Sequence, residues 1–350
     1  MECDRLRRDL PVLLLHNLDR TWSASSISEC LREVRTLRAS LRRLGHTVTT
    51  VEVNDPDFAS SLEGFDPSEH VVLNWCEEIP GLPHSEARVA EVLSEMNFTY
   101  TGATPDVLRL SWDKRKVKGL LEEGDIPTPR WRIYSKADPD GWHCFPSIVK
   151  PALEHCSYGV THGAVVLNPD EMRQRLEYVL TAFQQPALVE DFIDGREFHV
   201  TVWGNGTLKM LPPAEMDFAA FSSVRDRVCT YDSKFTEGSE AYEKIELRLP
   251  ARLSAEEKES LEETACRAYR AIGCRDYARM DVRLRDGLFH VLDVNPNPDI
   301  SSQTSMTLGA RLAGYSRGAM ASVLINLAAR RHEVFGAQFA ETASATAEAV

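Results

Sequence analysis

The first hundred residues alternate between short runs of β-forming apolar residues and longer amphipathic stretches. The β-type runs are residues 11–16, 47–53 and 70–76, and the helical stretches cover roughly 28–44 and 84–96. Strands that alternate with helices are typical of an α/β domain with a parallel sheet. The first strand is not followed by Gly-x-Gly-x-x-Gly, which argues against a dinucleotide-binding domain.

Short strands predominate in the next part of the chain. Thr104 and Pro105 predict the start of a helix, and Gly124 predicts its end. The β-type runs that follow lie at 130–134, 147–150, 163–167 and 187–190. Asn168, with Glu171 three residues later, predicts a helix between the last two of these runs. This pattern indicates a small α+β lobe.

The third part combines further β-type runs with two long helices. The runs lie at 197–203, 207–211, 278–284 and 289–295. One helix is expected from Ser254, where Glu257 completes a capping box, to Gly273, and a final helix covers roughly 308–330. The stretch from 217 to 240 has an irregular pattern.

These patterns predict an α/β protein with an N-terminal α/β domain, two α+β lobes and a tail. Residues 337–350 are mainly Ala, Thr, Glu and Ser, which have little to bury, so we expect a disordered tail there. The expected domains are 1–105, 106–194 and 195–336.

Composition and charge narrow the class of partner. The chain has 350 residues, and 40 Lys and Arg against 53 Asp and Glu give a net charge of −13, which argues against nucleic acid. No apolar run approaches the ~18 to 20 residues that span a bilayer, so no membrane partner is expected. The charged start, with its short apolar run from Pro11 to Leu15, is unlike a signal peptide, and the eight cysteines lack zinc-site spacing. We therefore expect a cytoplasmic protein with reduced thiols.

The densest chemical signal is a predicted hairpin near the C-terminal end. Asp281, Asp293 and Asn295 offer the oxygen ligands that Mg²⁺ prefers. A two-residue turn at Asp286–Gly287 would place Asp281 opposite Leu292 and would turn Asp293 toward the apolar face. That arrangement would bury a charge.

A three-residue connection at 286–288 instead pairs Asp281 with Asp293. Apolar residues then pair on the opposite face, Val282 with Leu292 and Met280 with Val294. We predict this register because it brings four polar side chains together, Arg279, Asp281, Asp293 and Asn295. The alternative is a charged hairpin face exposed to solvent.

Several lysines and one loop suit the phosphates of a nucleotide. Lys150 ends an apolar strand, Lys114 lies in a basic helical segment, and Lys234 lies in the irregular stretch. The loop with Ser157 and Gly159 offers backbone N–H groups to a phosphate. Taken alone, each lysine fits a solvated surface position better.

A further segment has the groups that an adenosine needs. Residues 188–193 supply an apolar slot and backbone amides, and Glu197 supplies a carboxylate for ribose hydroxyls. By itself the segment fits an ordinary strand and turn equally well.

Taken in order, seven segments resemble the ATP-grasp superfamily and, within it, the D-alanine–D-alanine ligase family. They are TYTG (99–102), SWDK (111–114), IVKP (148–151), LVEDFIDGREF (188–198), ARMDV (278–282), DVNPNP (293–298) and ARLAG (310–314). The first hundred residues agree only in their α/β pattern. The resemblance implies a three-domain ATP-grasp fold, in which two lobes behind an N-terminal α/β domain clasp ATP.

The resemblance also implies roles for the matching residues. Lys114 and Lys150 would hold the phosphates of ATP. The adenine would lie against Glu190, Asp191, Phe192 and Ile193, and Glu197 would bind the ribose. Two Mg²⁺ ions, or Mn²⁺ in their place, would bind Asp281, Asp293 and Asn295. The catalytic residues would be Arg279, which stabilises an oxyanion, Lys234, which closes over the γ-phosphate, and Ser157 of the phosphate loop.

The substrate subsites depart from the family's pattern. No carboxylate is in phase near Ser26, where the family grips the first amine. Four other positions of the substrate site carry a different residue from the family's: Cys156 replaces a serine, Phe235 a tyrosine, Asp299 a glycine and Thr304 a serine. Ser305, which follows Thr304, is also expected at the substrate site.

We therefore expect an ATP- and Mg²⁺-dependent ligase. It would join the carboxylate of one amino-acid-like substrate to the amine of another through an acyl phosphate, and the two substrates would not both be D-alanine. The alternatives are a D-alanine–D-alanine ligase of cell-wall synthesis and a non-catalytic nucleotide-binding protein. The expected partners are small-molecule carboxylates and amines, and a homodimer is compatible with this interpretation.

Overall fold

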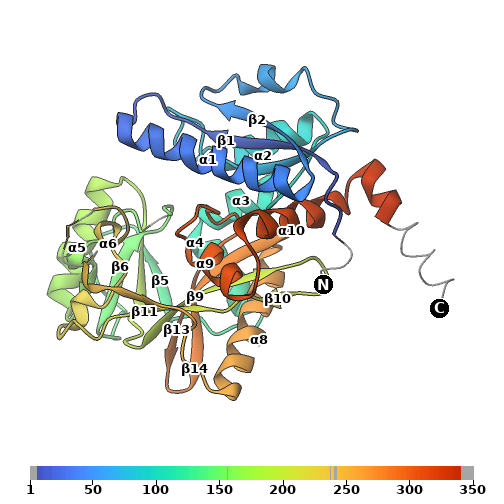
Figure 1. The fold of residues 1–350 in the computed structure, drawn as a ribbon. Helices are drawn as coiled ribbons and strands as arrows, with labels where there is room; N and C mark the ends of the chain where they lie inside the picture. The colour runs from blue at the N-terminus through green and yellow to red at the C-terminus, as the bar shows by residue number, and fades with distance from the viewer. Residues whose placement is uncertain (1–5, 156, 237, 240–242, 340–350) are drawn as a thin grey trace.

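The computed structural model describes residues 6–155, 157–236, 238–239 and 243–339, and it describes Lys234 and Phe235 by their backbone alone. Its mixed α/β architecture contains two four-stranded sheets and one six-stranded sheet (Figure 1), which confirms the expected fold class. In these ranges, no helix combines the length and the apolar character that crossing a membrane requires.

The N-terminal domain is a parallel sheet with helices on both faces. Its strands, in the order β2-β1-β3-β4, are β1 (Pro11–Asn17), β2 (Thr47–Val53), β3 (Val71–Trp75) and β4 (Thr99–Tyr100). One face packs on α1 (Ala24–Leu44) and α10 (Arg317–Ala329), and the other on α2 (Glu86–Glu95) and the 3₁₀ segment η2 (Phe58–Leu62). The carboxyl ends of β1 and β3 lie at one sheet edge, where open α/β sheets bind ligands.

The central lobe is an antiparallel sheet with one long helix. Its strands, in the order β5-β8-β6-β7, are β5 (Trp131–Tyr134), β8 (Ala187–Asp191), β6 (Ser147–Pro151) and β7 (Val165–Val166). The helix α5 (Pro169–Ala182) begins at the predicted cap, where Asn168 accepts a hydrogen bond from the Glu171 amide. The strand expected at 163–167 is present but shorter, since β7 covers only Val165–Val166 and η3 (His162–Ala164) takes up the residues before it.

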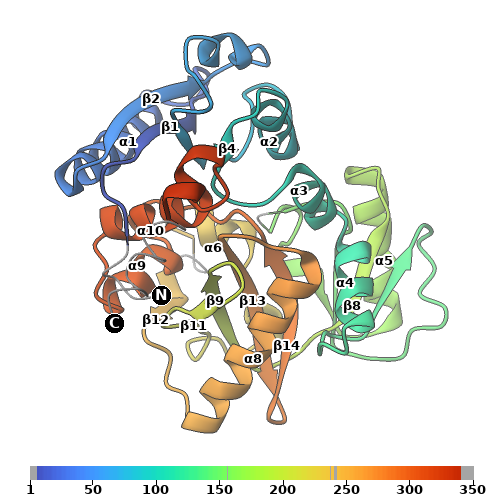
Figure 2. The ribbon, with the colours of Figure 1, turned by 90° about the vertical axis from the view of Figure 1, so that its right-hand side faces the viewer.

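The C-terminal lobe contains the largest sheet. The strands are, in order, β12 (Glu246–Arg248), β11 (Ala214–Asp217), β9 (Arg196–Trp203), β13 (Tyr277–Arg285) and β14 (Leu288–Asn295), with β10 (Lys209–Met210) beside β9. The helix α8 (Ala255–Ile272) packs on one face (Figure 2) and begins with the predicted capping box at Ser254. Figure 1 shows the central lobe beside this sheet.

Two helices that the sequence predicts as continuous are broken. The first divides into α3 (Pro105–Trp112) and α4 (Lys114–Glu123). The break occurs because Asp113 between them has an extended backbone and caps α4 with its side chain. The second is α9 (Ser305–Leu312) and α10, separated by Gly314 at φ +89° and by the α10 cap Ser316. The helix α10 packs between the N-terminal sheet and the C-terminal lobe, and it is therefore buried on nearly all sides.

The predicted register of the β13–β14 hairpin is partly correct. Asp281 pairs with Asp293 and Met280 pairs with Val294, as predicted. The connection is wrong, since Asp286 and Gly287 form a two-residue turn with positive φ at both positions. A bulge at Leu292 then restores the pairing of the aspartates, so Val282 lies opposite Val291 and not Leu292.

Candidate active site

A single pocket between the central and C-terminal lobes collects most of the predicted site residues. Both lobes contribute, with Lys114 from the start of α4 and the loop around Ser157. The predicted residues that line it are Lys114, Lys150, Ser157, Glu190, Asp191, Phe192, Ile193, Glu197, Asp281 and Asp293. Residues up to 179 positions apart therefore meet in one cavity.

A buried carboxylate between two buried lysines forms the back of this pocket. Glu190 is 1% exposed, and its two oxygens lie 2.5 Å from the Nζ atoms of Lys118 and Lys150. Desolvation alone would raise the pKa of Glu190, but the two ammonium groups lower it below its ordinary value. Glu190 therefore stays ionised and fixes both lysines, of which Lys150 faces the pocket.

The two aspartates of the hairpin lie opposite each other at the pocket wall. Oδ2 of Asp293 accepts a hydrogen bond of 3.1 Å from Lys114, and Asp281 accepts bonds of 2.8 and 3.1 Å from the guanidinium of Arg279. Desolvation raises the pKa of Asp293, but Lys114, His155 and Lys150 outweigh it and hold the pKa below the ordinary value. Asp293 is thus ionised, and Asp281 lies directly opposite it, so the two side chains offer carboxylate oxygens to a cation.

Asn295 and Arg279 form the second pair of the hairpin beyond the two aspartates, after the pair of Met280 with Val294. They are paired in the β13–β14 register, so the side chain of Asn295 shares a sheet face with Asp293. Oδ1 of Asn295 accepts a 3.1 Å hydrogen bond from the Asn297 amide. The predicted group of four polar residues is therefore assembled on one face.

An apolar slot lies beside these charges. Phe192 and Ile193 follow β8, and the bulge at Leu292 lets this residue line the pocket next to Asp293. Asp191 is held by Arg285, with 2.6 Å between Oδ2 and Nη2. A flat aromatic ring surrounded by apolar side chains and strand-end backbone groups is what such a slot accommodates.

Arg283 organises the wall around Glu197. It is 2% exposed and donates to Glu197 at 2.7 Å, to the Ile193 carbonyl at 2.8 Å, and to the Arg227 carbonyl. Its guanidinium also lies 4.6 Å from the ring centre of Phe192. One side chain thus fixes the carboxylate expected at the ribose and the loop that leads to α6 (Tyr231–Phe235).

The loop between β6 and η3 lies at the side of the pocket where phosphates are expected. Ser157 and Gly159 both have positive φ, 60° and 77°, and Ser157 lines the pocket. The predicted Cys156 lies outside the described residues. Lys234 and Phe235 belong to α6, and their side chains are likewise outside what the structure describes.

Three aromatic rings connect this loop to the N-terminal domain. Trp112 at the end of α3 stacks on His84 at 4.1 Å and meets His155 edge-on at 4.4 Å between ring centres. Burial, with a smaller contribution from Lys114, lowers the pKa of His155 to about 4, so its ring is neutral at pH 7. His84 also pairs with Glu154 at 3.2 Å.

The predicted acceptor residues lie apart from this pocket, near the N-terminal sheet edge. Asp299 accepts a 2.8 Å hydrogen bond from the Trp75 indole and a 2.9 Å bond from the Ser301 amide. Thr304 caps α9 by accepting from the Thr307 amide, and Ser305 is the first residue of that helix. The carboxylate of Asp299 is therefore held in one orientation, and the hydroxyl of Thr304 serves as the cap of α9.

Sequence reasoning missed three residues of this arrangement. Lys118 is 1% exposed and shares Glu190, and its signal was a lysine four residues after Lys114 on an apolar helix face. Arg283, two residues after Asp281, had only strand alternation to indicate it. Trp75 meets a residue 224 positions away, and no local pattern predicts such a contact.

Known proteins match both the sequence and the fold. Residues 128–326 match the family model described as D-ala D-ala ligase C-terminus. The chain is 30% identical over 302 residues to the uncharacterized protein y4sG of Sinorhizobium fredii, which covers 84% of this chain and 86% of that protein. It is 27% identical over 293 residues to the D-alanine–D-alanine ligase of Pseudothermotoga lettingae, with 83% and 91% covered.

A solved structure shows the same fold. The D-alanine–D-alanine ligase from Bacillus anthracis complexed with ATP matches with a TM-score of 0.69 at 19% identity. The match covers 92% of this chain and 98% of that one. The two folds are therefore similar over nearly the whole length of both chains.

Proposed function

The chain belongs to the D-alanine–D-alanine ligase family of ATP-grasp enzymes, and within this family we propose that its two substrates are nevertheless not both D-alanine. It is an ATP-dependent, ADP-forming ligase that makes carbon–nitrogen bonds, and it requires a divalent cation. The proposed reaction joins the carboxylate of one amino-acid-like substrate to the amine of another, by way of an acyl phosphate.

We assign two Mg²⁺ ions, which Mn²⁺ can replace, to Asp281, Asp293 and Asn295. The fit rests on three oxygen-bearing side chains on one sheet face, two of them directly opposite each other. When bound, the cations neutralise charge on the phosphate oxygens. Lys114 donates a hydrogen bond to Asp293, so it would contact both the bound phosphates and a ligand of the cations.

The remaining roles are assigned from the pocket wall. Lys150, fixed by Glu190, would hold a phosphate, and Glu197, fixed by Arg283, would accept from the ribose. Arg279 would stabilise the oxyanion that forms when the amine attacks. Each of these side chains is oriented by a second charged residue, so little reorganisation is needed on binding.

The observation that carries the specificity proposal is the fixed carboxylate of Asp299. The family's pattern has a glycine at this acceptor position, whereas here Trp75 and Ser301 hold a negative charge in place. Desolvation and, to a smaller extent, the neighbouring Asp299 and Glu78 raise the pKa of Glu77 to about 7, so further carboxyl groups lie near Asp299. An acceptor with a free carboxylate would be repelled here, and an amine without one would be favoured.

The subsite for the first amine supports the same conclusion. At the position where the family carries its acidic residue, Ser26 bonds to Ser23 within the first turn of α1. The nearest acid along the helix, Glu29, pairs with Arg32 at 3.0 Å. A D-alanine ammonium would therefore lose its usual partner.

ADP release from ATP, measured with a library of amino acids, amines and small acids, tests the proposal. D-alanine alone is expected to give slow release, and an amine without a free carboxylate is expected to give faster release, with the product identified by mass spectrometry. Asp299→Gly is expected to raise the D-alanine rate, whereas the matched Asp286→Gly, on the exposed hairpin turn, leaves it unchanged. If D-alanyl-D-alanine forms faster than any other product, the protein is a D-alanine–D-alanine ligase and the proposal fails.

A further inference from the structure

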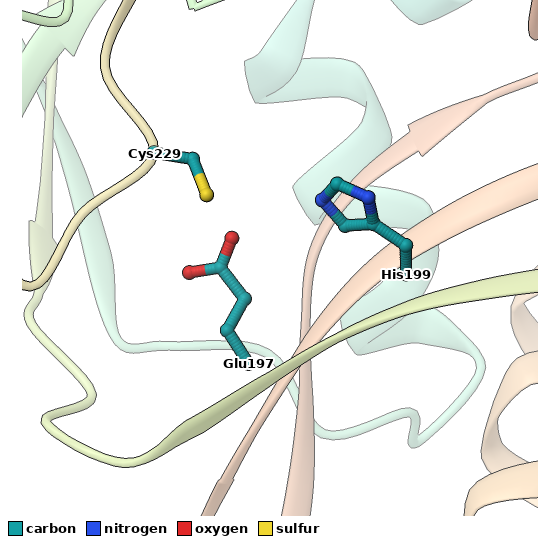
Figure 3. Close-up of side chains that lie close together, drawn as sticks. All are labelled: Glu197, His199 and Cys229. Atoms are coloured by element: carbon teal, nitrogen blue, oxygen red, sulfur yellow. The ribbon is translucent and has the colours of Figure 1, made fainter. Parts of the chain in front are cut away.

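Three side chains of different chemistry converge on the wall of the nucleotide pocket. Figure 3 shows the Cys229 thiol beside the Glu197 carboxylate, with the His199 ring to one side. One ligand atom from each of the three lies within 4.8 Å of the others. Glu197 and Cys229 also line the pocket, and all three residues are largely buried.

The fold accounts for this convergence. Glu197 and His199 are two apart on β9, so their side chains share one sheet face. Cys229 comes from the segment between η4 (Val224–Asp226) and α6, where Arg283 donates to the Arg227 carbonyl. The same arginine bonds Glu197 at 2.7 Å, so one buried side chain fastens both halves of the cluster.

We propose that Glu197, His199 and Cys229 form a binding site for Zn²⁺. Thiolate, imidazole and carboxylate are the three ligand types that proteins use for this ion. The thiolate and the carboxylate together neutralise its two positive charges. Arg283 bonds one oxygen of Glu197 and leaves the other for the ion, as hydrogen-bonded carboxylate ligands of metals are commonly held.

The distances require only a small closure. Zinc bonds of about 2.3 Å to sulfur and about 2.0 to 2.2 Å to nitrogen and oxygen place two ligand atoms about 3.5 Å apart in a tetrahedron. Starting from 4.8 Å, the cluster needs movements of about 1 Å, which rotations of the side chains supply. The fourth position would face the pocket, where water or a substrate atom can bind.

Zinc at this site would compete with the nucleoside part of ATP. Glu197 cannot bind the ion and accept from a ribose hydroxyl in the same geometry, and Cys229 lies on the same wall. This consequence rests on the assignment of Glu197 to the ribose, whereas the metal site itself does not. The two claims therefore need separate measurements.

Co²⁺ and Zn²⁺ added to the protein without nucleotide test the site itself. Co²⁺ is expected to give a thiolate charge-transfer absorption in the near ultraviolet, and a competing chromophoric chelator gives the affinity for Zn²⁺. Cys229→Ser is expected to abolish the absorption and weaken Zn²⁺ binding at least tenfold, and His199→Ala to weaken it similarly. The matched Cys266→Ser, a buried cysteine on α8, is expected to keep both signals. An absorption that survives Cys229→Ser would overturn the site.

Adenosine tests the competition, since it has no phosphates to chelate the metal. With Zn²⁺ at ten times its own dissociation constant, exclusive binding raises the apparent Kd of adenosine about elevenfold. Cys229→Ser is expected to remove this increase. If Zn²⁺ binds with the thiolate signature but the Kd of adenosine does not change, the competition is refuted and the assignment of Glu197 to the ribose is contradicted with it.

Discussion

Lys118 and Lys150 share one carboxylate but face different surroundings, and this difference can be measured. Lys118 points into protein, where it donates to Oγ1 of Thr128 at 2.7 Å and to the Val291 carbonyl at 3.2 Å. Lys150 lines the pocket. Lys118→Met and Lys150→Met should therefore damage different properties of the protein.

The magnitudes follow from what each substitution leaves unpaired. Lys118→Met breaks a buried ion pair and two hydrogen bonds, so the free energy of unfolding should fall by about 3 kcal/mol. The loss is not larger because Glu190 keeps its ion pair with Lys150. Lys150→Met should cost about 1.5 to 3 kcal/mol of phosphate binding, or ~10- to 150-fold in nucleotide affinity. Nucleotide affinity in Lys118→Met should change less than about threefold, because its ammonium does not line the pocket.

Urea unfolding and calorimetry with a non-hydrolysable ATP analogue measure the two effects. Lys116→Met is the matched control, since Lys116 is exposed on the same helix and should change neither quantity. The argument is refuted if Lys118→Met weakens nucleotide binding as strongly as Lys150→Met while its stability is unchanged. It is also refuted if Lys150→Met binds the analogue normally.

Four more substitutions test other parts of the structure. Asp293→Asn should raise the Mg²⁺ concentration for half-maximal ADP release at least tenfold, and Asp281→Ala should abolish turnover in the same assay. Desolvation raises the pKa of Glu86 from 4.5 to about 8, so its ionisation destabilises the folded state as the pH rises from about 4.5 to 8. Glu86→Gln should thus match wild type in urea unfolding at pH 4 and be more stable at pH 9. Asp113→Ala removes the cap of α4 and should lower the free energy of unfolding by about 1 kcal/mol.

Local signals predicted much of the fold. Short runs of β-forming residues located β1, β2 and β3, and side-chain caps located the starts of α5 and α8. The pairing of Asp281 with Asp293 was predicted by keeping charges off the apolar face, although the turn was wrong. A bulge changes register by one residue without changing the pattern, so the sequence does not distinguish it from a longer turn.

Contacts between distant segments account for what could not be predicted. The extended Asp113 that divides α3 from α4 is itself a good helix cap, but the continuing apolar pattern hid the break. Asp299 was singled out by its position, whereas its bond to Trp75 depends on how the N-terminal sheet docks on the C-terminal lobe. The convergence of Cys229 with Glu197 and His199 depends on loop geometry that Arg283 fixes.

The contacts of Trp112 with the rings of His84 and His155 give the protein a built-in optical signal. Trp112 contacts one ring from the N-terminal domain and one from the loop between β6 and η3. Indole fluorescence responds to the ring that stacks on it, so any movement of either neighbour changes the emission of Trp112. In a variant that keeps only this one of the six tryptophans, a stopped-flow instrument can record without any label whether, and how fast, ATP changes this emission.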